Sequence, residues 1–155
     1  WDTLWEAGED LEVSPGCPNL IERVEGGLLS YGNEMTRGNN PLECNLEKFC
    51  DLNGSVQYIG RSRLHEIAEQ GVDQRIRGIV FEGTPSSPCG FPWPLESNGQ
   101  KVGYTTTVVW SPRLKTNLAL AMVNKAYWET GDEVRVQLPD GSMREGYVTD
   151  LPFSV

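Results

Sequence analysis

The pattern of hydrophobic and polar positions changes character near residue 72. Before this point, short helical patterns alternate with glycine-rich turns, and after it, β-branched segments alternate with prolines and glycines. Val134, Val136 and Leu138 alternate with polar residues, which is typical of a strand with one buried face. We expect strands at residues 74–82, 102–110, 118–124, 132–138 and 143–149. Short antiparallel strands at this spacing favour a small barrel or sandwich.

Helices are predicted mainly in the first half of the chain. We expect a short helix over residues 2–8, a break at residues 14–16 and a better helix over residues 60–70. Another short helix is expected over residues 41–49. A further helix, predicted to start at Pro18, has an apolar stripe spaced at about 100° per residue, made of Leu20, Ile21, Val24 and Leu28. Gly26-Gly27 are expected to stop this helix at its C-terminus.

Two loops in the second half have distinctive sequences. Residues 139–142 read Pro-Asp-Gly-Ser between two predicted strands, which indicates a hairpin because proline presets one turn dihedral and glycine accepts a positive φ. Residues 85–94 contain four prolines. We expect a stiff loop between strands there, with a P-x-x-P ligand as the alternative.

Charge and composition exclude several functions. The chain has 155 residues and a net charge of −9, with 13 acidic and 5 basic side chains in residues 1–71. It offers no basic stripe for a phosphate backbone, so nucleic acid is a poor partner. It also has no apolar stretch approaching the roughly 18 residues of a membrane span. We therefore expect neither a nucleic-acid nor a membrane partner.

Cysteine and histidine are too few and too scattered for a structural zinc site. Cys17, Cys44, Cys50 and Cys89 form no C-x-x-C pair, and His65 is the one histidine. We expect no bound metal and free thiols in a reducing cytoplasm. Taken alone, the residue types predict an acidic α+β segment followed by a β-barrel, without a complete catalytic set. A barrel that only docks to a partner is one interpretation.

Ordered motifs along the chain add a resemblance. Residues 22–34 resemble the R-x-E-x-G-x-x-x-Y-G-x-[DE] signature of the aminomethyltransferase family, the glycine-cleavage T-proteins and their folate-dependent relatives. Further matches are Pro41-Leu42-Glu43 to T-P-x-E, with Asn40 where Thr is usual, and Tyr58-Ile59-Gly60-Arg61 to F-[IL]-G-[RK]. Residues 103–121 resemble G-x-x-T-S-G-x-x-S-P-x-L-x-x-x-[IV]-[AG], and Leu151-Pro152-Phe153 resembles the closing [LM]-P-F.

The resemblance implies that the chain is the C-terminal portion of a three-domain protein. Residues 1–71 would be the tail of the folate-binding domain, and residues 72–155 the C-terminal antiparallel β-barrel. The implied cofactor is tetrahydrofolate, and the catalytic aspartate would lie upstream of this chain. The implied partners are a small-molecule substrate, folate and the missing N-terminal part of the same protein. We expect the 155-residue chain alone to be inactive.

Details resemble the dimethylsulfoniopropionate demethylase branch of the family. Cys17-Pro18-Asn19 stands where T-proteins have a G-x-x-A-R-D-like sequence, and residues 30–44 resemble the branch's own turn. The implied reaction transfers a methyl group from a sulfonium sulfur to N5 of tetrahydrofolate. Alignment would do most of this work, because the carbon is already electrophilic. The alternative is an aminomethyltransferase of the glycine cleavage system, with a lipoyl carrier protein as partner.

Five residues are predicted to contact substrate or folate by this resemblance. The planar guanidinium of Arg23 suits recognition of a carboxylate on the substrate or folate. The alternative is a structural ion pair with Glu25 or a neighbouring acid. Tyr31 would line the cavity or simply pack. Trp110 would form a cation–π contact to the sulfonium, or be buried in the barrel. Glu22 and Glu34 are weaker candidates.

Overall fold

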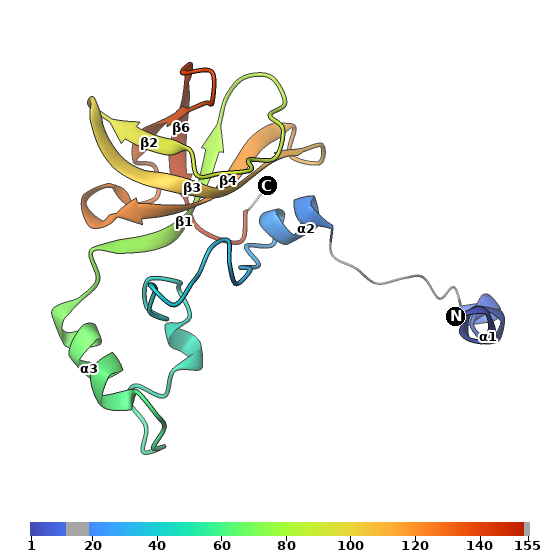
Figure 1. The fold of residues 1–155 in the computed structure, drawn as a ribbon, viewed down its shortest axis with the longest axis horizontal. Coiled ribbons are helices and arrows are strands. Elements are labelled where there is room, and N and C mark those ends of the chain that lie inside the picture. The colour runs from blue at the N-terminus through green and yellow to red at the C-terminus, as the bar shows by residue number, and fades with distance from the viewer. Residues whose placement is uncertain (12–18, 154–155) are drawn as a thin grey trace.

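The computed structural model describes residues 1–11 and 19–153, and its main feature is a closed antiparallel β-barrel (Figure 1). Its strands are β1 (Gln74–Phe81), β2 (Pro94–Ser97), β3 (Gln100–Ser111), β4 (Thr116–Asn124), β5 (Glu133–Gln137) and β6 (Met143–Thr149). Around the barrel they follow the order β1, β4, β3, β2, β5, β6, and pairing of β6 with β1 closes it. The barrel and the helices before it confirm the predicted α+β class.

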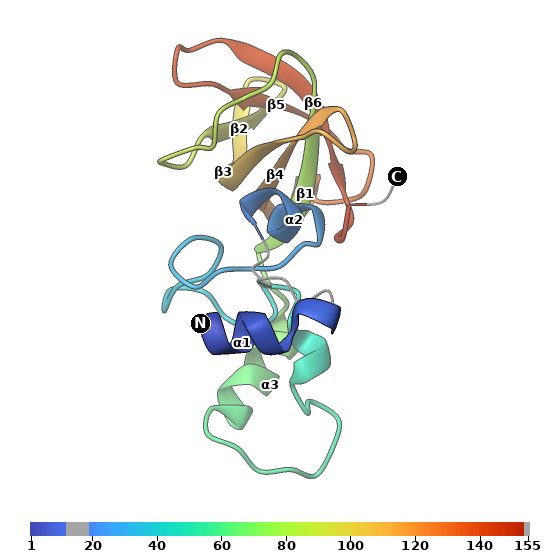
Figure 2. The ribbon, with the colours of Figure 1, turned by 90° about the vertical axis from the view of Figure 1, so that its right-hand side faces the viewer.

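The helices precede the barrel, apart from one short turn after β4. They are α1 (Asp2–Ala7), η1 (Glu9–Leu11), α2 (Leu20–Glu25), η2 (Glu47–Phe49), α3 (Arg61–Gln70) and η3 (Lys125–Tyr127), where η marks a 3-10 helix. Figure 2 shows α2 next to the barrel, with the loops and helices that follow it extending beyond. Over the described ranges, no helix combines the length and the apolar character needed to span a bilayer.

Five of the strands lie where the sequence predicts them, and β6 has the predicted bounds. β2 is absent from the prediction, because four residues are too few to show alternation. Its first residue is Pro94, and the first position of a strand tolerates the missing N–H. The predicted hairpin at residues 139–142 is confirmed: Gly141 has a φ of 82°, and its N–H donates to the Leu138 carbonyl at 2.9 Å.

α2 ends where the sequence predicts, at the Gly26-Gly27 stop. It ends at Glu25, and Gly27 then takes a φ of 65°, which turns the chain out of the helical path. Leu28 therefore leaves the predicted stripe and is 53% exposed, and Leu20 is exposed as well. The remaining stripe residues, Ile21 and Val24, pack against the barrel.

The helix expected over residues 41–49 is wrong. Asn45 adopts a left-handed φ of 55°, which interrupts the helical path and leaves η2 alone as helix there. The helix over residues 60–70 is confirmed as α3. The predicted break at residues 14–16, the helix start at Pro18 and the Cys17-Pro18 motif lie outside the described residues. The division of the chain at residue 72 stays a prediction.

β4 separates two apolar layers. Because strand side chains alternate between faces, Leu118 and Leu120 pack against α2 while Ala119 and Ala121 fill the barrel interior. Val24 of α2 completes the outer layer and is fully buried. Burying a side chain of this size contributes about 1.5–3 kcal/mol. These contacts fix α2 on β3 and β4, and so fix the motif residues that α2 carries.

Candidate functional site

α2 begins with a capping box that uses one of the predicted site residues. The Asn19 side chain accepts a hydrogen bond from the Glu22 amide at 2.9 Å, and the Glu22 carboxylate accepts one from the Asn19 amide at 3.3 Å. Together they satisfy two backbone donors at the helix start. Glu22 is exposed to solvent, and its carboxylate turns back toward the helix start.

The Arg23 guanidinium is directed inward and is paired. Its Nη1 donates to the Glu34 carboxylate and to the Leu28 carbonyl, both at 2.8 Å, and its Nη2 donates to Thr107 Oγ1 at 3.1 Å. The side chain of Arg23 is 16% exposed and that of Glu34 is fully buried. The predicted alternative of an ion pair is therefore present, with Glu34 as the partner rather than Glu25.

Glu34 is the centre of this network. One carboxylate oxygen accepts from Arg23 and from the Ser30 amide at 2.6 Å, and the other accepts from Thr107 Oγ1. Thr107 accepts from Arg23 while it donates to Glu34, so the three side chains form a closed circuit. A buried carboxylate needs such partners to offset its loss of hydration.

A β-bulge in β3 supplies the threonines. The register between β3 and β4 shifts between Thr105 and Thr107, which leaves Thr106 as the extra residue. Its hydroxyl donates to the Leu120 carbonyl at 3.0 Å and also lies 3.4 Å from the Glu34 carboxylate. Alternation would put neighbouring residues on opposite faces, and the bulge lets two consecutive threonines reach one carboxylate.

A second buried carboxylate ties α2 to the end of β3. Glu25 accepts from Ser111 Oγ at 2.5 Å and from Arg113 Nε at 2.8 Å. Burial raises the pKa of Glu25, but the hydrogen bonds from Ser111 and Arg113 outweigh burial, so the pKa lies below its ordinary value. The carboxylate is therefore held in its charged form at the interface.

Tyr31 and Trp110 are not part of the Arg23 network. Tyr31 lies in the turn before Glu34, and its side chain is 67% exposed. Trp110 is half-buried and pairs with Asn117 across the sheet. Its neighbours Val109 and Ser111 contact the α2 side, so alternation turns Trp110 to the other face of β3. The structure thus brings together two predicted site residues, Arg23 and Glu34, and separates the other three.

The closing Leu-Pro-Phe motif joins the same interface. The Phe153 amide donates to the Glu25 carbonyl at 3.0 Å, and the Phe153 ring is buried against α2 and the barrel. Gly27 lies under Leu151, and a Cβ on this glycine would come within 3.0 Å of the Leu151 Cβ. The glycine of the signature therefore permits both the turn after α2 and the return of the C-terminal segment.

The sequence prediction does not assign four residues that make these contacts: Thr106, Thr107, Ser111 and Arg113. The first three coincide with the T, S and S of the G-x-x-T-S-G-x-x-S-P pattern. This pattern was the available signal in the sequence, because serine and threonine hydroxyls can donate hydrogen bonds to carboxylates. The bulge itself has no pattern in the sequence that marks it.

Comparison with known families agrees with this geometry. A family model described as the glycine cleavage T-protein C-terminal barrel domain matches residues 74–154, which is just over half of the chain. The chain therefore belongs to the glycine cleavage T-protein, or aminomethyltransferase, family, as its motifs predict.

Its relatives are longer proteins. The chain is 46% identical over 151 residues to dimethylsulfoniopropionate demethylase DmdA of Ruegeria pomeroyi, an alignment that covers 95% of this chain and 41% of that protein. It is 35% identical to an aminomethyltransferase of Symbiobacterium thermophilum, over 99% of this chain and 40% of that protein. The crystal structure of the glycine cleavage system aminomethyltransferase T from Bartonella henselae matches with a TM-score of 0.76 at 25% identity, over 86% of this chain and 37% of that one. The chain thus spans about two fifths of the length of these relatives.

Proposed function

We propose that this chain is the C-terminal part of a tetrahydrofolate-dependent demethylase that transfers a methyl group from dimethylsulfoniopropionate to tetrahydrofolate. The observation that carries the proposal is the 46% identity to the Ruegeria pomeroyi demethylase, against 35% and 32% to two aminomethyltransferases. The rest of the protein would precede the barrel, because the matching family model is a C-terminal domain.

The chemistry of the proposed reaction demands little covalent help. The methyl carbon of a sulfonium is electrophilic, and its bond to sulfur breaks as N5 of the folate supplies the electron pair. The sulfur keeps the bonding electrons and leaves as the thioether of methylmercaptopropionate, and the methylated N5 releases its proton to solvent to give 5-methyltetrahydrofolate. Alignment of the two reactants therefore supplies most of the rate enhancement.

The described residues do not fit a complete folate site. Tyr31 and Glu22 are exposed, Trp110 lies on another face of β3, and most donors of Arg23 are already paired. No catalytic step is therefore assigned to a residue of this chain. The proposed contribution of residues 1–71 is one wall of the site, held on the barrel by the hydrogen bonds of Thr107 to Arg23 and Glu34 and by the Glu25–Arg113 pair.

A second candidate is an aminomethyltransferase of the glycine cleavage system. It is favoured by the Bartonella henselae structure, which shares the fold over 86% of this chain. The two candidates differ in the donor, a sulfonium in one and an aminomethyl-lipoyl carrier protein in the other.

The test is an assay of the full-length polypeptide with each donor and tetrahydrofolate. We expect methylmercaptopropionate from dimethylsulfoniopropionate, and no ammonia from the aminomethyl-lipoyl carrier. Ammonia release without methylmercaptopropionate would establish the second candidate instead. Absence of both products would leave the interpretation of a non-catalytic barrel.

A further inference from the structure

The fold leaves its large apolar side chains exposed on one half of the chain. Among the described residues of the barrel half, those exposed are Phe91 and Tyr147. Before the barrel, the exposed ones are Trp1, Leu4, Trp5, Leu11, Leu20, Leu28, Tyr31, Phe49, Val56 and Ile59. Exposed apolar residues are normal where they stand singly, so the informative ones are those that lie together.

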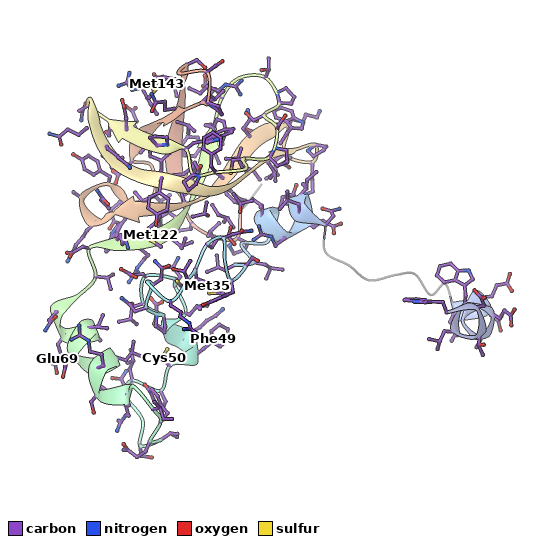
Figure 3. All side chains as sticks on the ribbon, viewed as in Figure 1. Met35, Phe49, Cys50, Glu69, Met122 and Met143 are labelled. Carbon is purple, nitrogen blue, oxygen red and sulfur yellow. The ribbon has the colours of Figure 1, made fainter. Side chains whose placement is uncertain are left out.

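Two of these exposed side chains, Leu28 and Phe49, border the same hollow. The hollow has a volume of about 340 Å³ and lies between the turn after α2 and η2. Leu28, Met35 and Phe49 line it, and Figure 3 shows Met35 and Phe49 close together on this side of the molecule. Leu28 and Phe49 are 53% and 74% exposed, so the lining is open to solvent. We call these three residues the apolar rim.

The segment that carries Phe49 has a weak core of its own. Its buried cluster consists of Leu42, Leu64 and Val72, each 7–8% exposed, whereas the interior residues of the barrel are close to 0%. The buried cluster around η2 is therefore smaller than the barrel interior. A segment of this kind gains stability from a further packed layer.

We propose that the apolar rim is where the preceding part of the same polypeptide packs. This inference rests on the proposed function, in which the chain is the C-terminal two fifths of a longer transferase. The missing part would fill the hollow with apolar side chains.

Hydroxyl-radical footprinting with mass spectrometry tests this contact without any substitution. The oxidation rates of Met35 and Phe49 are compared between the 155-residue chain and the full-length polypeptide encoded by its gene. We expect the rate at Phe49 to fall at least about fivefold in the full-length protein, as for a side chain entering an interface core. Phe91 and Tyr147 are the internal controls, and their rates should stay the same.

Equal rates at Phe49 in the two proteins would overturn the proposal. So would protection that appears in the 155-residue chain alone as its concentration rises, because the occupant would then be a second copy. Footprinting does not depend on turnover. A protected rim in a protein without demethylase activity would keep the docking inference and reject the proposed substrate.

A matched pair of substitutions gives a second measurement. Phe49→Ser and Phe91→Ser each replace an exposed phenylalanine ring. In the 155-residue chain we expect both variants to keep the Tm of the unsubstituted chain within about 1 °C. In the full-length protein, Phe49→Ser should lower Tm by about 2 °C or more, while Phe91→Ser should again have no effect. Identical behaviour of the two variants in both proteins would overturn the assignment of the rim.

Discussion

Two roles compete for the hydrogen-bond donors of the Arg23 guanidinium. The aminomethyltransferase resemblance assigns it to substrate or folate, and the structure pairs it with the buried carboxylate of Glu34. Three of its hydrogen bonds go to protein acceptors on the turn and on β3. The arginine therefore first positions the turn after α2, and any contact to a ligand would use the donors that remain.

The first prediction concerns the energy of this pair. Arg23→Met leaves the Glu34 charge buried without its cation and should lower the free energy of unfolding by about 2–4 kcal/mol, because breaking a buried pair strands a charge. Adding Glu34→Gln removes the stranded charge and should recover part of the loss. Urea unfolding of the two single variants and the double variant should give a coupling above about 1 kcal/mol.

The exposed pair Arg63–Glu66 is the matched control. Its side chains are 67% and 56% exposed, and its coupling in the same cycle should be about 0–0.5 kcal/mol. If the Arg23–Glu34 coupling proved as small as this one, the pair would not be a structural tie, and the guanidinium would be available to a ligand.

The second prediction concerns the charge of Glu25. Burial raises its pKa, but the hydrogen bonds from Ser111 and Arg113 prevail, so the folded-state pKa lies below the unfolded value near 4.5. The resulting stability is present above the unfolded pKa and is lost as the pH falls through the folded pKa. Glu25→Gln should therefore destabilise most at neutral pH, and its deficit should shrink below about pH 4.

Urea unfolding from pH 7 to pH 3 measures this deficit. Arg113→Ala should reduce the same pH-dependent part, since it removes one of the two groups that lower the pKa. A Glu25→Gln deficit that stayed constant over this range would contradict a lowered pKa.

α2 shows at the scale of an element how a family signature can serve folding. Its N-terminus is closed by the Asn19–Glu22 capping box, and its C-terminus by the turn at Gly27. Six residues are too few for a helix that is stable alone, so packing and capping decide whether it forms. Glu22, a predicted ligand contact, is used here in the cap.

The third prediction separates these two roles of Glu22. Asn19→Ala and Glu22→Ala should each lower the free energy of unfolding by about 0.5–1.5 kcal/mol, because each removes one half of the cap. Asn19→Ser and Glu22→Gln retain the acceptor and should cost far less. If Glu22→Gln left stability intact but weakened folate binding in the full-length protein, the role of Glu22 would be at the ligand.

The sequence predicts elements better than it predicts their contacts. Alternation located five strands because each is long enough to show one buried face, and β2 is too short to show it. The Gly26-Gly27 pair located the end of α2, whereas the apolar stripe wrongly included Leu28, which lies beyond the turn at Gly27. The contacts of Thr106 and Thr107 to Glu34 depend on the bulge in β3, which the sequence pattern does not reveal.

At the scale of the whole molecule, most signature residues connect the segment that precedes β1 to the barrel. The Arg23–Glu34 circuit, the Glu25–Arg113 pair and the return of Phe153 all connect the segment before residue 72 to the barrel. The motifs were predicted from family resemblance to line a cavity. Their described contacts instead hold α2 and the turn after it on the barrel.

The last prediction concerns folate binding by the 155-residue chain, which would hold only one wall of the proposed site. Calorimetric titration of the 155-residue chain with tetrahydrofolate, under anaerobic conditions, should show no binding at micromolar concentrations. Tyr31 and Glu22 are open to water there, and most Arg23 donors are already paired, so few groups remain to repay the cost of immobilising the ligand. The full-length protein should bind in the same titration, because the preceding part would complete the site.

Arg23→Met/Glu34→Gln in the full-length protein then tests the arginine itself. The double variant removes the guanidinium without stranding the Glu34 charge, so a change in affinity reports on the ligand rather than on a buried ion. We expect folate or substrate affinity to fall about tenfold, the loss of one charge-assisted hydrogen bond. Unchanged affinities would make Arg23 purely a structural residue, and micromolar binding by the 155-residue chain would mean that the wall alone is a site.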